Sequence, residues 1–249
     1  MEQPNAPDVA PLISVHCITF NHAGFIAAAL ESFLAQKTTF PVEIVVGEDC
    51  STDGTREIVE RYSKRYPKII RIISSDTNVG AVANFERTLK ACRGKYVAIC
   101  EGDDYWRDPY KLQIQVDFLE SHPDYVLAYH DATGFDQNGF DESPQLPAAY
   151  RVDADKTDLI RSRPLSTLTV CFRNLIRELP EEVRHSPILD LCMWSLLGWH
   201  GKGKFLPQIA SAAYRRHTGG IMSMQSEQSR LRMTAQAFLC LSRYYQRIG

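Results

Sequence analysis

The sequence predicts an α/β fold with a mostly parallel central sheet that is covered by helices on both faces. Two observations support this prediction. Over residues 11–122, short apolar segments alternate with segments of helical periodicity, which is the pattern of repeated βαβ units. The apolar segments are hydrophobic almost throughout, as is typical of strands that are buried on both faces of a sheet.

In chain order, each predicted strand of this half is followed by a predicted helix. Strands are expected over residues 12–20, 42–47, 68–74 and 95–100, and helices over residues 23–36, 51–66, 81–94 and 108–122. Ser, Thr and Asp residues open the second helix as capping residues, Gly94 is expected to end the third, and Pro109 lies in the first turn of the fourth. The helices therefore fall where a parallel sheet needs its crossover connections.

The regular alternation stops after residue 123. Residues 125–140 predict a strand followed by a turn-rich hairpin, and the polar residues 136–163 predict a long surface loop. Beyond them we expect strands over residues 165–173, 203–207 and 209–216, a helix over residues 186–201, and a final helix over residues 226–248. Because no internal repeat or linker separates the two halves, we expect one domain with a decorated C-terminal half.

The composition argues against several classes of function. The sequence has 28 Lys and Arg residues against 30 Asp and Glu residues, so no basic excess indicates nucleic-acid binding. No apolar run approaches the ~18 residues of a membrane span, and the polar start MEQPNAPDVAP lacks the features of a signal peptide. The seven cysteines include no C-x-x-C pair, so we expect buried free thiols, as in a reducing cytoplasm, rather than disulfides or a zinc site.

The carboxyl ends of the predicted strands are followed by polar and acidic residues. They are Thr19, Asn21 and His22 after the first strand, Glu48 and Asp49 after the second, Ser74, Ser75 and Asp76 after the third, and Glu101, Asp103 and Asp104 after the fourth. In an open parallel sheet these ends meet at one edge, where ligands bind. Carboxylates that converge there repel one another, and Mg²⁺ or Mn²⁺ would relieve the repulsion. Because Mg²⁺ usually completes its shell with substrate phosphates, the pattern indicates a phosphorylated ligand.

Two common phosphate-binding motifs are absent from the sequence. It contains no G-x-x-x-x-G-K-[ST] loop, and no G-x-G-x-x-G follows the first predicted strand. The segment STDGT (Ser51–Thr55) is similar to a phosphatase D-x-D-G-T motif, but Ser51 replaces its first aspartate. We therefore disfavour a P-loop protein, a classical dinucleotide-binding protein and a phosphatase.

Four segments in order resemble glycosyltransferase family 2. They are ISVHCITFNH, VEIVVGEDCSTDGT, NVGAVANFERTLKACRGKYVAICEGDD and YRRH, and the resemblance covers roughly residues 11–220. It implies the GT-A fold, a nucleotide-binding half over residues 11–122 and an acceptor-binding half over residues 123–220. A disordered tail is expected at residues 1–10, and a C-terminal helix within residues 221–249.

The resemblance also implies an activity. Such an enzyme transfers a sugar, with inversion and metal dependence, from a nucleoside-diphosphate sugar to an acceptor hydroxyl. The donor is expected to be a UDP-sugar, and the acceptor a glycan or a lipid-linked molecule in surface polysaccharide synthesis. One alternative stays open: Glu101 in place of the usual first aspartate would suit a non-catalytic GT-A module. We disfavour a nucleotidyltransferase, which would need a basic glycine-rich loop, because residues 21–24 contain neither Lys nor Arg.

The resemblance assigns roles to individual residues of this sequence. Nucleotide binding falls to Thr19, Asn21, Glu48, Asp49, Asn78, Gly80 and Asp103. The segment Glu101-Gly102-Asp103 is similar to the D-x-D motif, and contact with Mn²⁺ or Mg²⁺ falls to Glu101, Asp103, Asp104 and His217. Arg215 and Arg216 are assigned to the phosphates. Asp190, in LDLCMW, is assigned as the general base.

Some of these assignments have competing interpretations. Asp190 also suits the first turn of a helix for electrostatic reasons alone, and Asp124, Asp131 and Asp136 compete for the role of base. Trp106 suits either the core or stacking on an acceptor sugar. The last predicted helix carries Arg230, Arg232, Arg243 and Arg247 beside apolar residues. We prefer a helix packed on the domain, with contact to an anionic membrane or a partner subunit as the alternative. The expected location is cytoplasmic, with peripheral contact at the inner membrane face as the further possibility.

Overall fold

A seven-stranded sheet forms the centre of the computed structural model, which describes residues 10–220 and 225–249. Its strands are β1 (Ile13–Thr19), β2 (Val42–Glu48), β3 (Ile70–Ser74), β4 (Tyr96–Ile99), β5 (Tyr125–Tyr129), β8 (Cys171–Arg173) and β9 (Lys202–Phe205). Their order is β3-β2-β1-β4-β8-β5-β9, and β8 alone runs antiparallel to its neighbours. Residues 1–9 of the tail predicted at residues 1–10 lie outside the described residues.

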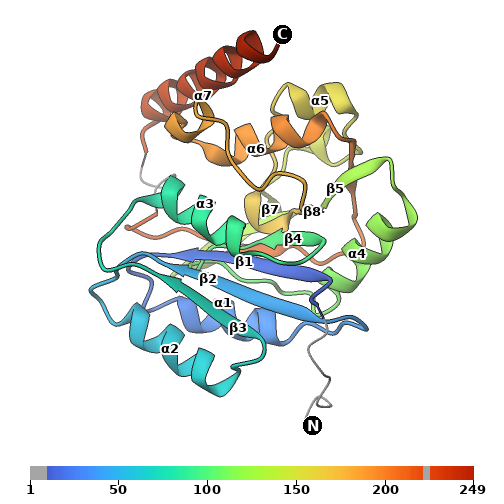
Figure 1. The fold of residues 1–249 in the computed structure, drawn as a ribbon. Coiled ribbons are helices and arrows are strands. Elements are labelled where there is room, and N and C mark those ends of the chain that lie inside the picture. The colour runs from blue at the N-terminus through green and yellow to red at the C-terminus, as the bar shows by residue number, and fades with distance from the viewer. Residues whose placement is uncertain (1–9, 221–224) are drawn as a thin grey trace.

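Helices cover both faces of this sheet, as predicted. They are α1 (Ile26–Leu34), α2 (Thr55–Arg65), α3 (Ala81–Ala91), α4 (Lys111–Ser121), α5 (Lys156–Ile160), α6 (Leu189–Gly198) and α7 (Glu227–Ile248), with short 3-10 turns η1 (Ala148–Tyr150), η2 (Thr167–Thr169) and η3 (Val183–His185). In Figure 1, α1 and α2 lie below the sheet, and α3, α5, α6 and α7 lie above it. A helix follows each of β1, β2, β3 and β4, so the predicted alternation of strand and helix is confirmed.

The central strand β1 has side chains buried on both faces of the sheet. Ile13, Val15 and Cys17 belong to the core under α1. Between them, His16 points to the opposite face, where its ring lies 4.4 Å from the ring of Phe85 on α3. Burial on both faces explains why the strand is apolar nearly throughout.

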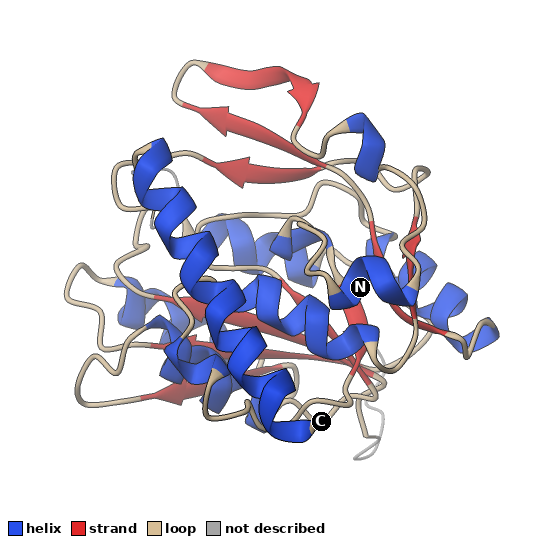
Figure 2. Cartoon of the chain, turned by 90° about the horizontal axis from the view of Figure 1, so that it is seen from above, coloured by secondary structure: helices blue, strands red, loops and turns tan. Residues whose placement is uncertain are grey.

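A second, smaller sheet lies beside the larger one (Figure 2). It consists of β10 (Ala212–Arg215), β6 (Ala132–Asp136) and β7 (Gly139–Pro144), in that order. The antiparallel pair β6–β7 is the hairpin that the sequence predicts. An isolated pair of hydrogen bonds between Tyr105 and Ala213 joins β10 to the segment that follows β4. The smaller sheet is thereby attached to the carboxyl edge of the larger one.

The predicted loop over residues 136–163 is wrong, because this segment contains β7, η1 and α5. Asp155 and Asp158 form a reciprocal capping box at the start of α5. Ala154 pairs with Gly203 of β9, which ties the segment to the larger sheet. The polar composition therefore reflects exposure to solvent and not a lack of secondary structure.

Two further boundary predictions are wrong. Gly94 does not end α3, which stops at Ala91 with Cys92 extended. A Cβ atom on Gly94 would lie 2.6 Å from the backbone nitrogen of Ser14, so glycine is needed there for the close approach of the chain to β1. The strand predicted over residues 165–173 is reduced to β8, because Thr169 folds back to bond the carbonyl of Ser166 and forms η2.

The cysteines are free, as predicted. Cys50 is partly exposed, and the other six are buried.

The long helix α7 packs on the molecule through one narrow stripe. Ala237, Cys240 and Leu241 are its buried residues, and it contacts α6 and η3. In Figure 1 it extends along the top of the molecule to the C-terminus. Although α7 spans 22 residues, neither it nor any other helix in the described part of the chain is apolar enough to cross a membrane.

A buried carboxylate joins three strands at the edge of the sheet where β2 begins. Glu43 is 2% exposed and accepts hydrogen bonds from Ser14 Oγ (2.7 Å), the backbone N–H of Arg93 (2.7 Å) and the guanidinium of Arg71 (2.9 Å). The Arg93 guanidinium also donates to it at 2.9 Å. Burial raises the pKa of Glu43, but these donors outweigh it, so the net pKa is lowered from its ordinary value.

We expect the substitution Glu43→Gln to lower the free energy of unfolding by about 2 kcal/mol, because the neutral amide loses the charge-assisted hydrogen bonds that the exposed guanidinium groups of Arg71 and Arg93 donate to the buried carboxylate. Since folding lowers this pKa, the contribution is present above the ordinary pKa of 4.5 and is lost as the pH falls through the folded value. Urea unfolding of both proteins from pH 3 to pH 7 measures it. Glu120→Gln is the control, because Glu120 pairs with Lys95 at the surface, where such pairs contribute at most about 1 kcal/mol. Equal losses for the two variants would contradict the prediction.

Candidate functional site

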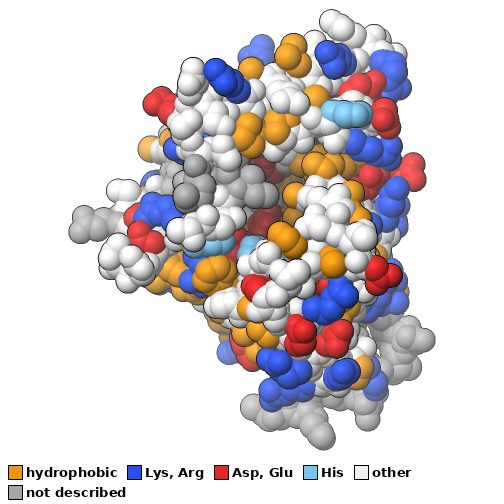
Figure 3. Space-filling model, turned by 90° about the vertical axis from the view of Figure 1, so that its left-hand side faces the viewer, with side chains coloured by type: hydrophobic (Ala, Val, Ile, Leu, Met, Phe, Trp, Pro, Cys, Tyr) orange, Lys and Arg blue, Asp and Glu red, His pale blue; other side chains and the backbone are white. Residues whose placement is uncertain are grey.

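The carboxyl ends of β1, β2 and β4 and the loop after β3 border a cavity of about 700 Å³. Parallel pairing aligns these ends, since Thr19 lies opposite Glu48, and Glu48 lies opposite Ser74. Figure 3 faces the edge of the molecule that is at the left in Figure 1, and shows a hollow with acidic and histidine side chains at its floor. The cavity therefore lies at the edge where parallel α/β sheets bind their ligands.

The acidic loop after β4 is packed tightly against the end of β1. The backbone N–H of Gly102 donates to the carbonyl of Ile18 at 2.9 Å. A Cβ atom on Gly102 would lie 2.7 Å from Thr19 Oγ1 and 2.9 Å from Ile26 Cδ1. Only glycine fits between the two acids, and Thr19 lines the cavity beside it.

Asp103 faces two histidines that come from loops far apart in the sequence. Its Oδ2 atom lies 3.0 Å from Nε2 of His217 and 3.8 Å from Nε2 of His22. The backbone N–H of Gly219 donates to Nδ1 of His217 at 3.2 Å, which leaves Nε2 directed at Asp103. In the part of the chain that the structure describes, these three side chains offer ligand atoms within 4.8 Å of one another. One carboxylate and two imidazoles in this arrangement fit a divalent cation.

Glu101 and Asp104, the other predicted metal ligands, have different surroundings. Asp104 is 4% exposed, and its Oδ1 atom accepts a hydrogen bond from the backbone N–H of Arg215 at 2.7 Å. Burial, Asp103 and Glu101 together raise the pKa of Asp104 well above its ordinary value. Burial and Asp103 raise the pKa of Glu101 to about 8. Both side chains line the cavity, and their contact with a cation stays a prediction.

Asp49 organises the loop that follows β3. It is 2% exposed, and its carboxylate accepts hydrogen bonds from the backbone N–H groups of Val79 (2.9 Å) and Gly80 (3.0 Å). Gly80 has a positive φ of 86°, and it also donates to the side-chain oxygen of Asn78. Asp49, Asn78 and Gly80 all line the cavity, so the structure brings these three predicted nucleotide-binding residues together.

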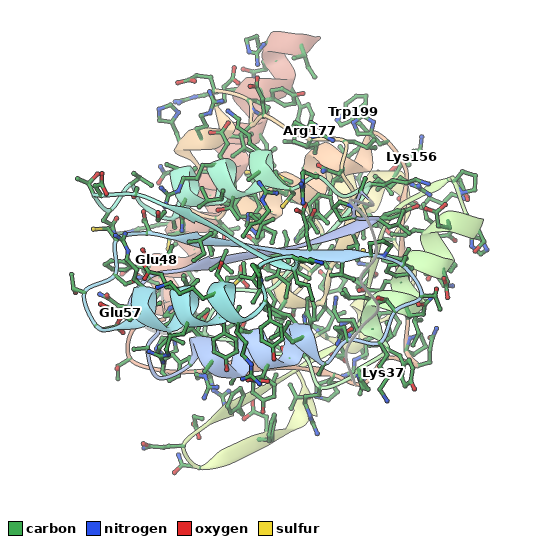
Figure 4. The ribbon with its side chains drawn as sticks, turned by 60° about the horizontal axis from the view of Figure 1, so that its bottom comes forward. Lys37, Glu48, Glu57, Lys156, Arg177 and Trp199 are labelled. Atoms are coloured by element: carbon green, nitrogen blue, oxygen red, sulfur yellow. The ribbon has the colours of Figure 1, made fainter. Side chains whose placement is uncertain are left out.

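Two other residues predicted to bind the nucleotide, Glu48 and Asn21, do not line the cavity. Glu48, labelled at the end of β2 in Figure 4, is fully buried and accepts from Arg56 Nε and the backbone N–H of Ser51, each at 2.6 Å. Asn21 accepts from the backbone N–H of Thr52 and has a positive φ of 54°. Through these contacts both residues support the loops that border the cavity.

The two arginines predicted to contact phosphate lie in different environments. Arg215 lines the cavity, and its Nε donates to the backbone carbonyl of Asp103 at 2.8 Å. Its guanidinium lies over the ring of Phe25 at 4.6 Å. Arg216 does not line the cavity, because its guanidinium is paired with both carboxylate oxygens of Asp141 on β7. Of the two, Arg215 alone presents positive charge toward the cavity.

Asp190 reaches the cavity from the first turn of α6, in the second half of the chain. Its carboxylate accepts hydrogen bonds from Thr167 Oγ1 at 3.1 Å and from the backbone N–H of Leu191 at 2.8 Å. Burial raises the pKa of Asp190 from its ordinary value, and these two hydrogen bonds oppose the shift. None of the competing residues Asp124, Asp131 and Asp136 lines the cavity.

The second half of the chain gives the cavity a mostly apolar wall. Its apolar residues include Leu146, Pro147, Pro164, Leu165, Ile188 and Leu189. Trp106 is not among them: it is 4% exposed, and its indole N–H donates to the carbonyl of Leu168 at 2.7 Å. The interpretation that Trp106 stacks on an acceptor sugar is therefore wrong, because the indole is fixed in the core beside Phe33.

Three residues of this site were assigned no role from the sequence. His22 was expected at the sheet edge, because it follows the first strand, but not as a possible metal ligand. Tyr214 and Thr167 also line the cavity. Burial and the nearby carboxylates raise the pKa of Tyr214 to about 12. Nothing in the local sequence distinguishes Tyr214 and Thr167 from ordinary strand or turn residues.

Comparison with known sequences identifies one family. Residues 14–183 match the family model described as Glycosyl transferase family 2. The chain is 38% identical over 214 residues to Uncharacterized protein Rv1520 of Mycobacterium tuberculosis, which covers 84% of this chain and 60% of that protein. It is 32% identical over 133 residues to TuaG of Bacillus subtilis, whose name proposes a glycosyltransferase of teichuronic acid biosynthesis. This alignment covers 51% of this chain and 52% of that protein. The chain thus spans about 60% and about half of the lengths of these relatives.

Solved structures confirm the predicted fold class. S. aureus TarS in complex with UDP-GlcNAc aligns with a TM-score of 0.66 at 20% identity, over 90% of this chain and 66% of that one. The mannosyltransferase PcManGT from Pyrobaculum calidifontis, in complex with GDP-Man and Mn²⁺, aligns with a TM-score of 0.69 at 17% identity, over 95% of this chain and 65% of that one. At these identities the likeness concerns the fold alone.

Proposed function

Because this chain belongs to glycosyltransferase family 2, we propose that it transfers a sugar from a nucleoside-diphosphate sugar to a hydroxyl group of an acceptor, with inversion at the anomeric carbon. The observation that carries the proposal is the placement of Asp49, Asp103 and Asp190 around one cavity. Asp49 and Asp103 lie at the polar sheet edge, which suits the donor. Asp190 lies on the side of the apolar wall, which suits the acceptor.

The donor side is proposed to hold a UDP-sugar. Asp49 and the loop of Asn78 and Gly80 form the part of the cavity that would take the nucleoside, and Arg215 places positive charge near Asp103. A divalent cation held by Asp103 and His217 would neutralise the negative charge on the leaving diphosphate. Of the two aligned structures, one contains UDP-GlcNAc and the other GDP-Man, so the test includes both nucleotides.

The acceptor side is proposed to work through Asp190 as general base. An ionised Asp190 would take the proton from the acceptor hydroxyl as the oxygen attacks the anomeric carbon. The hydrogen bond from Thr167 and the backbone N–H of Leu191 hold the carboxylate in place. A partly apolar surrounding strengthens a carboxylate base, because burial raises its pKa.

The acceptor is proposed to be lipid-linked rather than a free glycan. A free polysaccharide offers hydroxyl groups, and a wall formed by residues such as Leu146, Leu165 and Leu189 offers them few partners. An acceptor with an apolar portion would instead bury that portion against this wall. The name of TuaG places that relative in teichuronic acid biosynthesis, which supports the proposed role in surface polysaccharide synthesis.

The first test is a thermal unfolding screen with UDP-, GDP-, dTDP- and CMP-sugars, each with and without Mn²⁺. A specific donor at ~100 times its dissociation constant should stabilise the protein by ~2.7 kcal/mol, since only the folded state binds it. We expect the shift for a UDP-sugar, with a requirement for the metal, and its loss in Asp49→Ala. Asp117→Ala, on the exposed face of α4, is the control and should keep the shift. No shift with any nucleotide would overturn the proposed donor site.

The second test separates the roles of Asp190. We expect Asp190→Asn to keep donor binding and to lower turnover by about 10²- to 10⁴-fold, which is the usual contribution of a general base. In the wild type, kcat should fall as the pH drops through the pKa of Asp190, which burial places above the ordinary 3.8, because only the ionised carboxylate accepts the proton. The variant should lack this acidic limb. Loss of donor binding in Asp190→Asn, with turnover intact in the control Asp124→Asn, would show that Asp190 is structural.

A peripheral membrane contact is proposed for the outer face of α7. Leu231, Ala235, Phe238 and Leu239 lie at i, i+4, i+7 and i+8, on one stripe, and their side chains are exposed. Leu231 is 64% exposed and Leu239 is 59% exposed. The helix carries four arginines and one glutamate, so its charge suits an anionic bilayer. Such a contact would bring the cavity to a lipid-linked acceptor.

Sedimentation with lipid vesicles tests this contact. We expect the protein to bind vesicles of phosphatidylcholine with phosphatidylglycerol, and not phosphatidylcholine alone. Binding should be lost in the double variant Leu231→Ser/Leu239→Ser, because the apolar stripe is removed. Phe140→Ser removes an exposed aromatic from β7 instead and should leave binding unchanged. Absence of wild-type binding to anionic vesicles would refute the contact, and a concentration-dependent dimer lost in the double variant would assign the stripe to a second copy.

A further inference from the structure

The cavity floor contains a second histidine that the D-x-D pattern does not predict. We propose that His22 is a third protein ligand of the divalent cation, beside Asp103 and His217, and that this donor set makes the site prefer Mn²⁺ to Mg²⁺. The inference deepens the proposed function, on which it rests for the presence of a cation. It concerns which residues hold the ion and which ion they select.

The three side chains converge from separate loops. His22 follows β1, Asp103 follows β4 and His217 follows β10. The distances from Asp103 Oδ2 are 3.0 Å to His217 Nε2 and 3.8 Å to His22 Nε2, and the two imidazole rings meet edge to face with centroids 5.9 Å apart. The side chains are 15%, 18% and 13% exposed, in chain order, so the group is shielded from bulk water, and two of its members, His22 and Asp103, line the cavity.

The position of His22 is set by its backbone and not by its ring. Its backbone N–H donates to Thr55 Oγ1 at 2.8 Å, and its carbonyl accepts from the N–H groups of Phe25 and Ile26 at the start of α1. By contrast, Nδ1 of the ring is buried without a hydrogen-bond partner among the described residues. Nε2 lies 3.8 Å from the carboxylate, which is too far for a hydrogen bond. No structural hydrogen bond therefore accounts for a polar ring at this point.

An ion between the three groups accounts for the arrangement. Nε2 of His22 and Oδ2 of Asp103 are separated by more than a hydrogen bond and by less than twice a typical metal–ligand distance. Phe25 packs against both rings, at 4.7 Å from His217 and 6.2 Å from His22, and so restricts their orientation. The three loops are thus arranged to present one oxygen and two nitrogens to a common point.

The donor set determines which ion is favoured. Mg²⁺ prefers oxygen ligands, whereas imidazole nitrogen is a ligand of first-row transition metals. A site formed by the carboxylates of Glu101, Asp103 and Asp104 would suit Mg²⁺, but Glu101 and Asp104 lie outside the group of converging ligand atoms. With two imidazoles and one carboxylate, the metal-binding atoms favour Mn²⁺ over Mg²⁺.

Binding of Mn²⁺ alone, without nucleotide, tests the inference independently of activity. Isothermal titration with MnCl₂ and MgCl₂ should give tighter binding of Mn²⁺, and electron spin echo spectra of bound Mn²⁺ should show coupling to two histidine nitrogens. In His22→Phe we expect one nitrogen coupling to disappear and the Mn²⁺ affinity to fall by about tenfold or more. His122→Phe, which changes an exposed histidine at the C-terminal end of α4, should change neither measurement.

The outcomes separate this inference from the proposed function. Two nitrogen couplings and unchanged Mn²⁺ affinity in His22→Phe would overturn it, as would tighter binding of Mg²⁺ in the wild type. Far-ultraviolet circular dichroism and His22→Gln guard against a folding defect, because glutamine keeps a polar side chain and should still lose the nitrogen coupling. If no nucleotide sugar shifts the unfolding temperature while Mn²⁺ binds with two nitrogens, the glycosyl-transfer proposal fails and the metal site stands.

Discussion

The contact between Gly102 and the end of β1 is the constraint on which the cavity depends. Gly102 donates to the carbonyl of Ile18 and leaves no room for a side chain against Thr19. This close approach fixes the direction of the two acids on either side of it. Just beyond these acids, Tyr105 pairs with Ala213 of β10. This pairing brings β10, and His217 after it, to the same part of the molecule. Packing at a single glycine thus positions groups that are more than 100 residues apart.

Five buried or half-buried carboxylates of this protein lie in two opposite electrostatic environments. Glu43 and Glu48 are paired with arginines, and despite burial their pKa values are lowered. Glu101, Asp104 and Asp190 border the cavity, and burial raises their pKa values without a comparable cation to oppose it. The first class stabilises the fold at neutral pH. The second costs stability there and is the kind of perturbed group that marks a functional site.

The two halves of the chain contribute different chemistry to one cavity. The parallel half supplies hydrogen-bonding and acidic groups from the ends of its strands, including Asp49 and Asp103. The second half supplies the apolar wall and Asp190, which η2 positions through the hydroxyl of Thr167. The larger sheet includes strands of both halves, so the two contributions are held in one rigid frame. A polar side and an apolar side facing each other suit two substrates of different polarity.

Local sequence signals determined the parallel half of this protein. Strands apolar throughout, each followed by a helix, have few alternative arrangements, and the right-handed crossover places all their carboxyl ends at one edge. For that reason Asp49 and Asp103 could be expected to share one sheet edge from the strand pattern, whereas Asn78 and Gly80 were expected there only from the resemblance to glycosyltransferase family 2. The same logic extends to His22, whose place after β1 was visible in the sequence. The second half gave weaker signals, because its strands are short and its pairing is with strands far away in the chain.

Tertiary structure alone decided how the remaining side chains are used. Arg215 and Arg216 are adjacent in sequence, but their side chains point in different directions at the end of β10. Arg215 bonds the carbonyl of Asp103 beside the cavity, and Arg216 pairs with Asp141. Glu48 and Asp49 are likewise adjacent, and the turn after β2 buries the first against Arg56 while the second faces the loop of Gly80. Trp106 lies two residues after Asp104, but its indole is fixed by the carbonyl of Leu168. The sequence determined which edge of the sheet carries the polar and acidic groups. Long-range hydrogen bonds and close packing selected the residues that face the cavity. The physical reason is that neighbouring side chains point in different directions, and contacts with residues far away in the chain fix those directions.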